Sequence, residues 1–389
     1  MTSASLPATG TGGRDAPGDG PRPVSARTVR RLARLVLAAS AALAALGVVW
    51  LLVPGISPFA ELLVSPLGAL LGPSAVAGIA IGSGAVGALL AAVPAGSGRL
   101  PRPGAVAAAS ALLLVVGLAA LGSVGILAYA GYLFGQFAVL AAIAAVVVSL
   151  VRAPRVGIRF LLGLAAIVAV VVFVGGVDLD GLGTFLAMFA AAVVPQLGAL
   201  AVSLVIVVAV LAWAALGAAA FGASDGGRRF EAWLVRHRTA ITVLAALGPL
   251  PYALVRASWL TPWPLWAPDD VEMGGALLVT GLMLGSGAVA AAILTIGLVR
   301  PWSLRFPAWM PAVGRASVPP AFPIGFGLFA ATVLCLAAVP MVLLLGAGAE
   351  SPLQLLEALV VLPIWYWGPT LALAVWAYAA RRRTEPVAA

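Results

Sequence analysis

Arginine alternates with long apolar runs throughout this chain, and that alternation limits its fold more than any other feature. All 22 basic residues are arginines, and 21 of them fall in segments that can lie together on one side of a membrane. Short, positively charged connections between apolar runs stay in the cytoplasm during insertion, so their distribution sets the topology. The sequence therefore predicts a multi-pass protein of the bacterial cytoplasmic membrane, with both termini in the cytoplasm.

The composition indicates that the bilayer is the main solvent. Hydrophobic residues make up 63% of the 389 residues and charged residues 9%, whereas a soluble domain has roughly 25% charged residues. The formal net charge of +9 does not indicate a nucleic-acid partner. The arginines are spread over short loops, where they face anionic lipid headgroups instead.

Ten apolar runs approach the roughly 20 residues that a helix needs to cross the hydrocarbon core. They are predicted at residues 33–53, 74–95, 105–125, 128–151, 159–177, 195–220, 240–259, 275–299, 322–346 and 355–379. The outer connections then carry acidic residues in place of arginines, namely Glu61, Asp178, Asp180, Asp269, Asp270, Glu272 and Glu350. We expect an all-α transmembrane bundle of about ten spans, and eight or twelve spans would also satisfy the charge pattern.

The bundle is expected to fill residues 27–383. Residues 1–26 are rich in Gly, Pro, Ser and Thr and predict a disordered cytoplasmic tail. Residues 384–389 form a cytoplasmic C-terminal tail in this interpretation. The other large polar pieces are loops at 222–238 and 300–320, so any activity must come from the membrane body.

Arg256 is the only arginine predicted near the outer end of a span, where an ionisable group is costly and therefore a candidate functional group. Pro249 and Pro251 precede it and remove backbone hydrogen bonds, which predicts a broken helix. Several transporters bind solute at a broken helix beside a buried charge, so Arg256 and Tyr252 are candidate ligand-binding residues. Two alternatives are that Arg256 extends outward to the headgroups, or that it pairs with an acidic residue. The acidic candidates are Asp269, Asp270, Glu272 and Glu357.

Further candidate residues lie on the last predicted span. Glu357 is placed about one turn inside its outer end, and Trp365, Tyr366 and Trp367 follow near mid-bilayer. Trp and Tyr at that depth need polar partners or a cavity for their N–H and O–H groups. They therefore predict either ordinary helix packing or the wall of an apolar ligand pocket. Gln196 is a candidate for ligand binding or for a hydrogen bond between helices.

Metal, cofactor and enzyme signatures are weak in this sequence. Asp269, Asp270 and Glu272 form one short acidic run that is a weak candidate for a divalent-cation site, and a solvated loop is the favoured interpretation. A single cysteine, Cys335, and a single histidine, His237, exclude a metal centre built on several such residues. There is no phosphate-binding glycine loop, zinc-protease helix or nucleophile elbow. No cofactor, metal or catalytic residue is predicted, and an enzyme is not the favoured class.

A glycine-rich motif occurs twice. Gly82-Ser83-Gly84-Ala85-Val86 recurs as Gly285-Ser286-Gly287-Ala288-Val289. The recurrence fits either a parallel repeat of the kind found in transporters or chance in apolar helices. Under both interpretations, the small residues predict close approach of helix backbones.

The polar loop at 300–320 and the predicted span at 240–259 contain motifs that resemble those of a protein family. The loop contains Arg300-Pro301-Trp302, Phe306-Pro307 and Val318-Pro319-Pro320, and the helix contains Pro249-x-Pro251-Tyr252. Over about residues 240–325 these motifs resemble a group of uncharacterised multi-spanning membrane proteins common in actinobacteria. The resemblance implies a source and a topology but no mechanism. The loop's prolines and aromatics also predict a fixed structure on the inner membrane face, either a docking surface or a well-packed connection, and the latter is favoured.

Three functions remain open on these observations. The first is permease-like transport or binding of a small or lipophilic solute, which predicts that Arg256 and Glu357 face a shared cavity. The second is a non-catalytic membrane scaffold or subunit of an envelope or export complex, which predicts a filled bundle core and a membrane-protein partner. The third is a lipid-modifying enzyme, which predicts a metal between Asp269 and Glu272.

Overall fold

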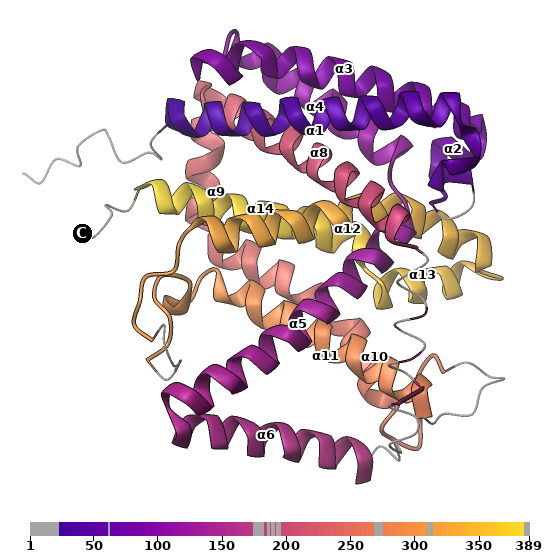
Figure 1. Ribbon diagram of the computed structural model, residues 1–389, viewed down its shortest axis with the longest axis vertical. Coiled ribbons are helices and arrows are strands. Elements are labelled where there is room, and N and C mark those ends of the chain that lie inside the picture. Colours follow the sequence, from indigo (N-terminus) through magenta and orange to yellow (C-terminus); the bar gives the residue numbers. More distant parts are fainter. Residues whose placement is uncertain are drawn as a thin grey trace, which may run out of the picture.

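The protein is an all-helical membrane bundle in the computed structural model (Figure 1). The structure describes residues 23–60, 63–173, 196–267, 275–308 and 314–384, together with positions 183, 184, 187, 191 and 310. Within these residues all regular structure is helical apart from one isolated antiparallel bridge between Arg305 and Ser317. Several predictions lie outside the described residues. They concern most of both tails and the acidic residues Glu61, Asp178, Asp180, Asp269, Asp270 and Glu272.

Eight helical segments among the described residues are long and apolar enough to cross a membrane. They are α1 (Ala26–Leu52), α3 (Pro73–Ser97), α4 (Pro103–Ala120), α8 (Leu197–Gly222), α9 (Asp225–Leu247) with α10 (Leu250–Ser258), α11 (Gly275–Gly297), α12 (Ala321–Gly348), and α13 (Pro352–Val361) with α14 (Ile364–Thr384). Two more helices, α5 (Val124–Arg152) and α6 (Pro154–Phe173), occupy the positions of two further predicted spans. The prediction of a multi-pass helical membrane protein is confirmed.

Helix starts follow from local sequence. Proline occupies the first helical position of α3, α4, α6 and α13, where its missing N–H costs nothing. Serine caps other starts by accepting a hydrogen bond from a backbone N–H of the first turn. Ser123 does so for α5, with the N–H of Gly125 as donor, and places the turn between α4 and α5 just before it.

The arginine-bearing connections gather on one side of the bundle. Figure 1 shows the first turn of α1, the last turn of α14, the α5–α6 turn and the loop between α11 and α12 on its left. The short helices α2 (Pro66–Leu71), α10 and α13 lie on the opposite side. Among the described residues, these arginine-bearing connections thus share one side, as the charge pattern predicts.

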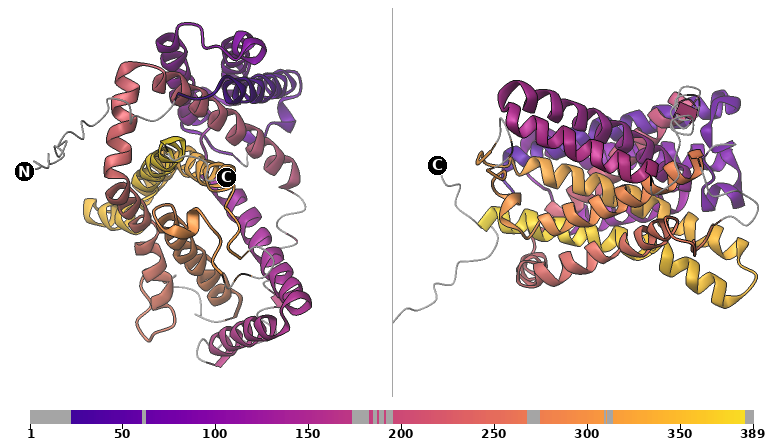
Figure 2. Two further views of the ribbon diagram at one scale, coloured as in Figure 1. Left: turned by 90° about the vertical axis from the view of Figure 1, so that its left-hand side faces the viewer. Right: turned by 90° about the horizontal axis from the view of Figure 1, so that it is seen from below.

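The apolar core of the described residues has two large clusters and a small third one at Trp259 and Leu278. The first joins α1, α3, α4 and α8 around the fully buried Trp213, and the second joins α9, α12 and α14 around Val375 and Tyr378. Helices α5 and α6 form a hairpin at the far end of the bundle from α1, α3 and α4 (Figure 2). The first cluster and the second cluster meet where α12 contacts α8 and α5.

The closest helix pair is α1 with α3, and small residues make that approach possible. A Cβ added at Gly84 would lie 2.6 Å from the carbonyl oxygen of Ser40, and one added at Gly47 would lie 2.7 Å from that of Ala77. A Cβ at Gly87 would collide with the hydroxyl of Ser40, which accepts a 2.9 Å hydrogen bond from the indole N–H of Trp213. The prediction of close packing holds for Gly84 and Gly87. It is wrong for Gly82, which has open space around it.

Two predicted boundaries are wrong. The loop expected at 222–238 is helical from Asp225 onward, because the Ser224 side chain accepts from the Gly227 N–H and starts α9 well before the apolar stretch. The last span, expected as one helix over 355–379, is divided at Leu362–Pro363 into α13 and α14. Pro363 lacks the N–H that would continue the first of these helices.

Replacement of Gly84 by valine should destabilise the protein because the new side chain meets the α1 backbone. Overpacking of this kind costs about 1–3 kcal/mol. Gly82→Val is the matched control, since Gly82 lies two residues away on the same helix with no atom within 4 Å of an added Cβ. Thermal unfolding in detergent, followed by tryptophan fluorescence, should show a lower midpoint for Gly84→Val only. Equal midpoints for the two variants would contradict the assigned α1–α3 contact.

Candidate functional site at two interrupted helices

The helix that carries Arg256 is interrupted, as its prolines predict. Helix α9 ends at Leu247 and α10 begins at Leu250. At the interruption the Gly248 N–H donates to the carbonyl of Ala245 at 3.2 Å, one residue short of the regular partner. The Leu244 carbonyl thereby loses its backbone donor. A carbonyl left unsatisfied inside a bilayer is costly, so this one needs a side-chain donor.

A second interruption occurs between α13 and α14. Regular helix geometry would pair the Leu359 carbonyl with the N–H of residue 363, but that residue is Pro363. The Trp365 indole N–H donates to the Leu359 carbonyl instead, at 3.1 Å. Trp365 is otherwise 52% exposed. Its side chain therefore completes the backbone of its own interruption.

The two interruptions lie against each other. The Tyr366 hydroxyl donates to the freed Leu244 carbonyl. The Trp367 ring covers Gly248 so closely that a Cβ added there would lie 2.6 Å from Trp367 Cγ. The indole nitrogen of Trp367 is buried and has no hydrogen-bond partner among the described residues. Two of the three predicted aromatics thus join α14 to the interruption in α9–α10.

Arg256 lies about two turns beyond the interruption and is held by aromatic side chains of its own helix end. Its Nε donates to the Tyr252 hydroxyl at 2.9 Å. Its guanidinium carbon lies 4.0 Å from the centre of the Trp259 ring and 4.9 Å from that of Tyr252. Stacking of this kind stabilises the cation by about 0.5–2 kcal/mol. The side chain is half-buried.

Two glycines of α11 make room for this group. A Cβ at Gly285 would lie 2.7 Å from Arg256 Cβ, and one at Gly281 would lie 2.5 Å from the Trp259 ring. Gly287 has no such neighbour within the described structure. Gly285 in the second copy of the glycine motif therefore receives an arginine side chain, whereas Gly84 in the first copy receives helix backbone. The two copies do not pack alike.

No carboxylate neutralises Arg256 within the described residues. The ion pairs there join Arg228 to Asp225 and Arg383 to Glu231. Glu357 is exposed on α13, which contacts α10, but no ion pair links it to Arg256. The acidic residues Asp269, Asp270 and Glu272 lie outside the described residues. Nε is bonded to tyrosine and one face is stacked on tryptophan, and the two Nη groups of Arg256 have no partner among the described residues.

Gln196, another predicted site residue, is separate from this group. It lies at the N-terminal end of α8, where its side chain does not cap the helix, and it has no hydrogen bond to a described residue. Trp259, which stacks on Arg256, is buried, and its indole N–H donates to the Leu265 carbonyl at 2.9 Å. Trp263 and Trp266 are exposed beside it.

A buried carboxylate escaped the sequence analysis. Glu231 on α9 is only 4% exposed and accepts from Arg383 Nη2 at 2.6 Å and from the Trp376 indole N–H at 2.9 Å. The sequence places Glu231 in a loop of arginines, which hides it. Helical spacing from Asp225 would have grouped it with the buried Gly227 and Leu234, since residues three and four apart share a face.

Comparison of the chain with models of protein families, with curated proteins and with solved structures finds no match in any of the three. Among the residues that the structure describes, no group of three His, Cys, Asp or Glu side chains is placed to hold a metal ion. The chemistry of the site therefore rests on Arg256 and on the two interrupted helices.

Loss of the Tyr366 hydroxyl should destabilise the protein less when α9 can supply a backbone donor to the Leu244 carbonyl. In the native sequence, Tyr366→Phe leaves the Leu244 carbonyl unpaired and should lower stability by about 0.5–1.5 kcal/mol. In a Pro249→Ala background an added N–H at position 249 can restore regular pairing, which frees the Gly248 N–H for Leu244. A double-mutant cycle of thermal unfolding should then show a smaller cost of Tyr366→Phe. Identical costs in both backgrounds would separate the tyrosine from the interruption.

Proposed function

We propose that this protein is a permease-like membrane protein that binds and moves a small anionic solute with an apolar body. One observation carries the proposal. Two spanning helices are interrupted at one level and touch there, and a half-buried arginine that has no carboxylate partner among the described residues lies about two turns away.

The paired interruptions of α9–α10 and α13–α14 would allow these helices to move during transport. Discontinuous helices build solute sites in many secondary transporters, because their free backbone groups and flexible joints lie beside the site. Here the Tyr366–Leu244 hydrogen bond and the Trp367–Gly248 contact join the two joints. A hydrogen bond between membrane helices contributes on average about 0.6 kcal/mol. The two helices can therefore separate and rejoin at small cost.

Arg256 supports recognition of an anion. A guanidinium binds carboxylate and phosphate oxygens through parallel N–H donors, and the Nη groups of Arg256 have no partner among the described residues. The stacked Trp259 and Tyr252 keep the guanidinium plane fixed. Those rings, together with the half-buried setting, favour a solute whose charged end is attached to an apolar body.

Our proposal for the topology is ten spans with both termini in the cytoplasm of a bacterial cytoplasmic membrane, with α5 and α6 counted as the two additional spans. The segregation of arginine-bearing connections to one side supports it, because cytoplasmic loops carry the excess of arginine. The length of α5 and α6, at 29 and 20 residues, is sufficient to cross the bilayer.

The topology is testable by cysteine labelling in a Cys335→Ser background. Ala153→Cys lies between α5 and α6, Ser317→Cys in the α11–α12 loop and Glu350→Cys between α12 and α13. A membrane-impermeant maleimide applied to intact cells should label only Glu350→Cys, and the other two should react after permeabilisation. Labelling of Ala153→Cys in intact cells would remove α5 and α6 from the spans, and labelling of Ser317→Cys would reverse the orientation.

Recognition is testable with hexyl phosphate as the probe, because it combines an anionic group with a short apolar chain. The purified protein should unfold at a higher temperature with hexyl phosphate than with hexyltrimethylammonium. Arg256→Gln should abolish this difference, and Arg256→Lys should retain part of it since the charge remains. Arg315→Gln, at an exposed arginine on the other side of the bundle, is the control.

Transport is then measured in proteoliposomes with labelled hexyl phosphate. Uptake should exceed that of protein-free liposomes and fall by about tenfold in Arg256→Gln, which corresponds to roughly 1.4 kcal/mol of lost recognition. If the probe neither stabilises the protein nor enters the vesicles, the scaffold or subunit role becomes the better account.

A further inference from the structure

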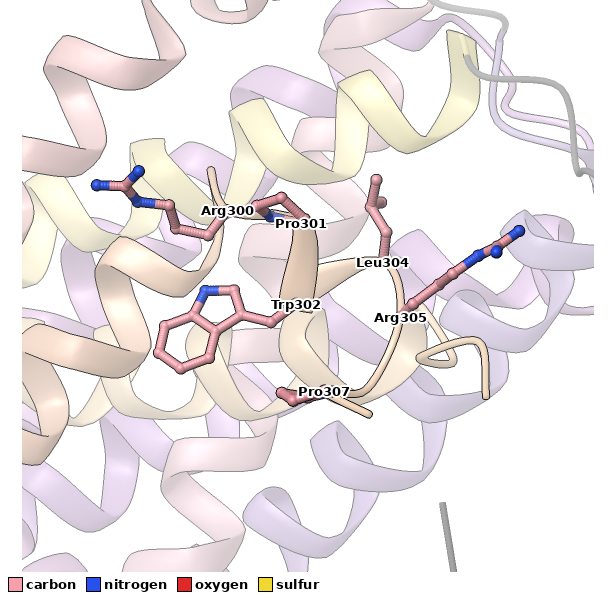
Figure 3. Close-up of a pocket in the computed structure, with 6 residues that line it drawn as sticks. All are labelled: Arg300, Pro301, Trp302, Leu304, Arg305 and Pro307. Carbon is pink, nitrogen blue, oxygen red and sulfur yellow. The ribbon is translucent and has the colours of Figure 1, made fainter. Parts of the chain in front are cut away.

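The loop between α11 and α12 forms a groove on the side of the bundle that carries the chain ends (Figures 1 and 3). Its volume is about 610 Å³, and the residues that line it are Arg300, Pro301, Trp302, Leu304, Arg305 and Pro307. It is independent of Arg256, whose helix end lies on the opposite side (Figure 1). The groove combines an apolar floor with arginines at its edges.

The groove belongs to a loop with a fixed backbone. The short helix η4 (Pro301–Ser303) opens the loop, and three backbone hydrogen bonds of 2.9–3.0 Å then close a small hairpin across it. These bonds run from Phe306 to Ala316, from Arg315 to Phe306 and from Val318 to Leu304. The hydroxyl of the buried Tyr378 donates to the Ser303 carbonyl at 2.9 Å and ties the loop to α14. A shape held in this way can bind a ligand without first paying to order itself.

Arg300 and Arg305 carry the charge of the groove. Figure 3 shows their side chains extending in opposite directions from the two ends of the groove, with Trp302 between them. Both arginines are exposed, and neither side chain has a hydrogen bond or ion pair to a described residue. The connecting segment 298–320 contains no acidic residue at all. The groove is therefore complementary to an anion.

The position of the groove determines what kind of anion reaches it. Arg300 follows α11 by three residues, and α12 begins at Ala321, so the groove lies where two spanning helices emerge from the hydrocarbon. Trp302 is 39% exposed there, and tryptophan at this depth contacts the glycerol and upper acyl region of lipids. A molecule in this layer with an anionic head and an apolar body is a phospholipid.

We infer that this groove binds the headgroup of an anionic phospholipid, with phosphate oxygens on Arg300 and Arg305 and the glycerol region over Trp302. Two guanidinium groups at opposite ends of one groove favour a headgroup with two phosphates, as in diphosphatidylglycerol, over one with a single phosphate. The bound lipid fixes the loop against the membrane face and covers the exposed Trp302.

The test is lipid binding to the full-length protein by native mass spectrometry in neutral detergent. The probes are diphosphatidylglycerol, phosphatidylglycerol and phosphatidylcholine. The affinity should be highest for diphosphatidylglycerol, which has two phosphates, and lower for phosphatidylglycerol, which has one. It should be lowest for phosphatidylcholine, whose headgroup has no net charge. The double variant Arg300→Gln/Arg305→Gln should lower the affinity for diphosphatidylglycerol by about tenfold or more. Trp302→Ala should weaken all three lipids, because it removes a contact with the part they share.

Arg315→Gln is the matched control, since Arg315 is exposed in the same loop but does not line the groove. It should bind diphosphatidylglycerol as the native protein does. Both arginine variants should also keep the thermal midpoint of the lipid-free protein, which shows that they are folded. The inference is overturned if Arg315→Gln loses as much affinity as the double variant, if the double variant binds normally, or if phosphatidylcholine binds as well as the anionic lipids. Displacement of the lipid by millimolar inorganic phosphate would also overturn it, by assigning the groove to free phosphate.

Discussion

Backbone carbonyls without a donor are the constraint on which the C-terminal half of this bundle depends. In water a freed carbonyl is hydrated, but in hydrocarbon it must be bonded within the protein. Prolines leave two carbonyls without a donor, and side chains of the run Trp365-Tyr366-Trp367 donate to both of them. Trp365 satisfies Leu359 within its own helix pair, and Tyr366 reaches across to Leu244. The aromatic run is therefore part of the helix scaffold, and the contact between the two interrupted spans arises from the same requirement.

Glycines make two kinds of close contact in this bundle. Between α1 and α3, glycine and serine let backbone meet backbone. Between α9–α10, α11 and α14, glycine makes room for large side chains instead, at Gly248, Gly281 and Gly285. The glycines of α1 and α3 thus allow two helix backbones to approach, whereas Gly248, Gly281 and Gly285 accommodate bulky side chains of neighbouring helices.

Sequence reasoning recovered the features that local physics controls. The apolar runs predicted the helices, and the arginines predicted which connections share one side of the bundle. Pro249 and Pro251 predicted the interruption before Arg256. It failed where distant contacts decide the outcome. In sequence, Pro363 resembles Pro340, which lies inside the uninterrupted helix α12. The helix is interrupted at Pro363, where the Trp365 indole N–H takes the place of the missing backbone donor to the Leu359 carbonyl. Glu357 looked like a partner for Arg256 in a continuous span, but the break turns α13 into a short separate helix with Glu357 exposed. Glu231 was concealed by neighbouring arginines, although its partners lie on α14.

The Glu231 cluster has a consequence for how the chain is assembled in the membrane. Arg383 follows Glu231 by 152 residues, so a ribosome finishes α9 long before it makes the arginine that neutralises the carboxylate. An uncompensated charge is expensive to bury. Until α14 arrives, α9 must therefore keep its first turns at the wet surface and cannot settle to its final depth. Completion of α14 then removes that restraint, and the order of synthesis ensures that the interrupted helices lock together last.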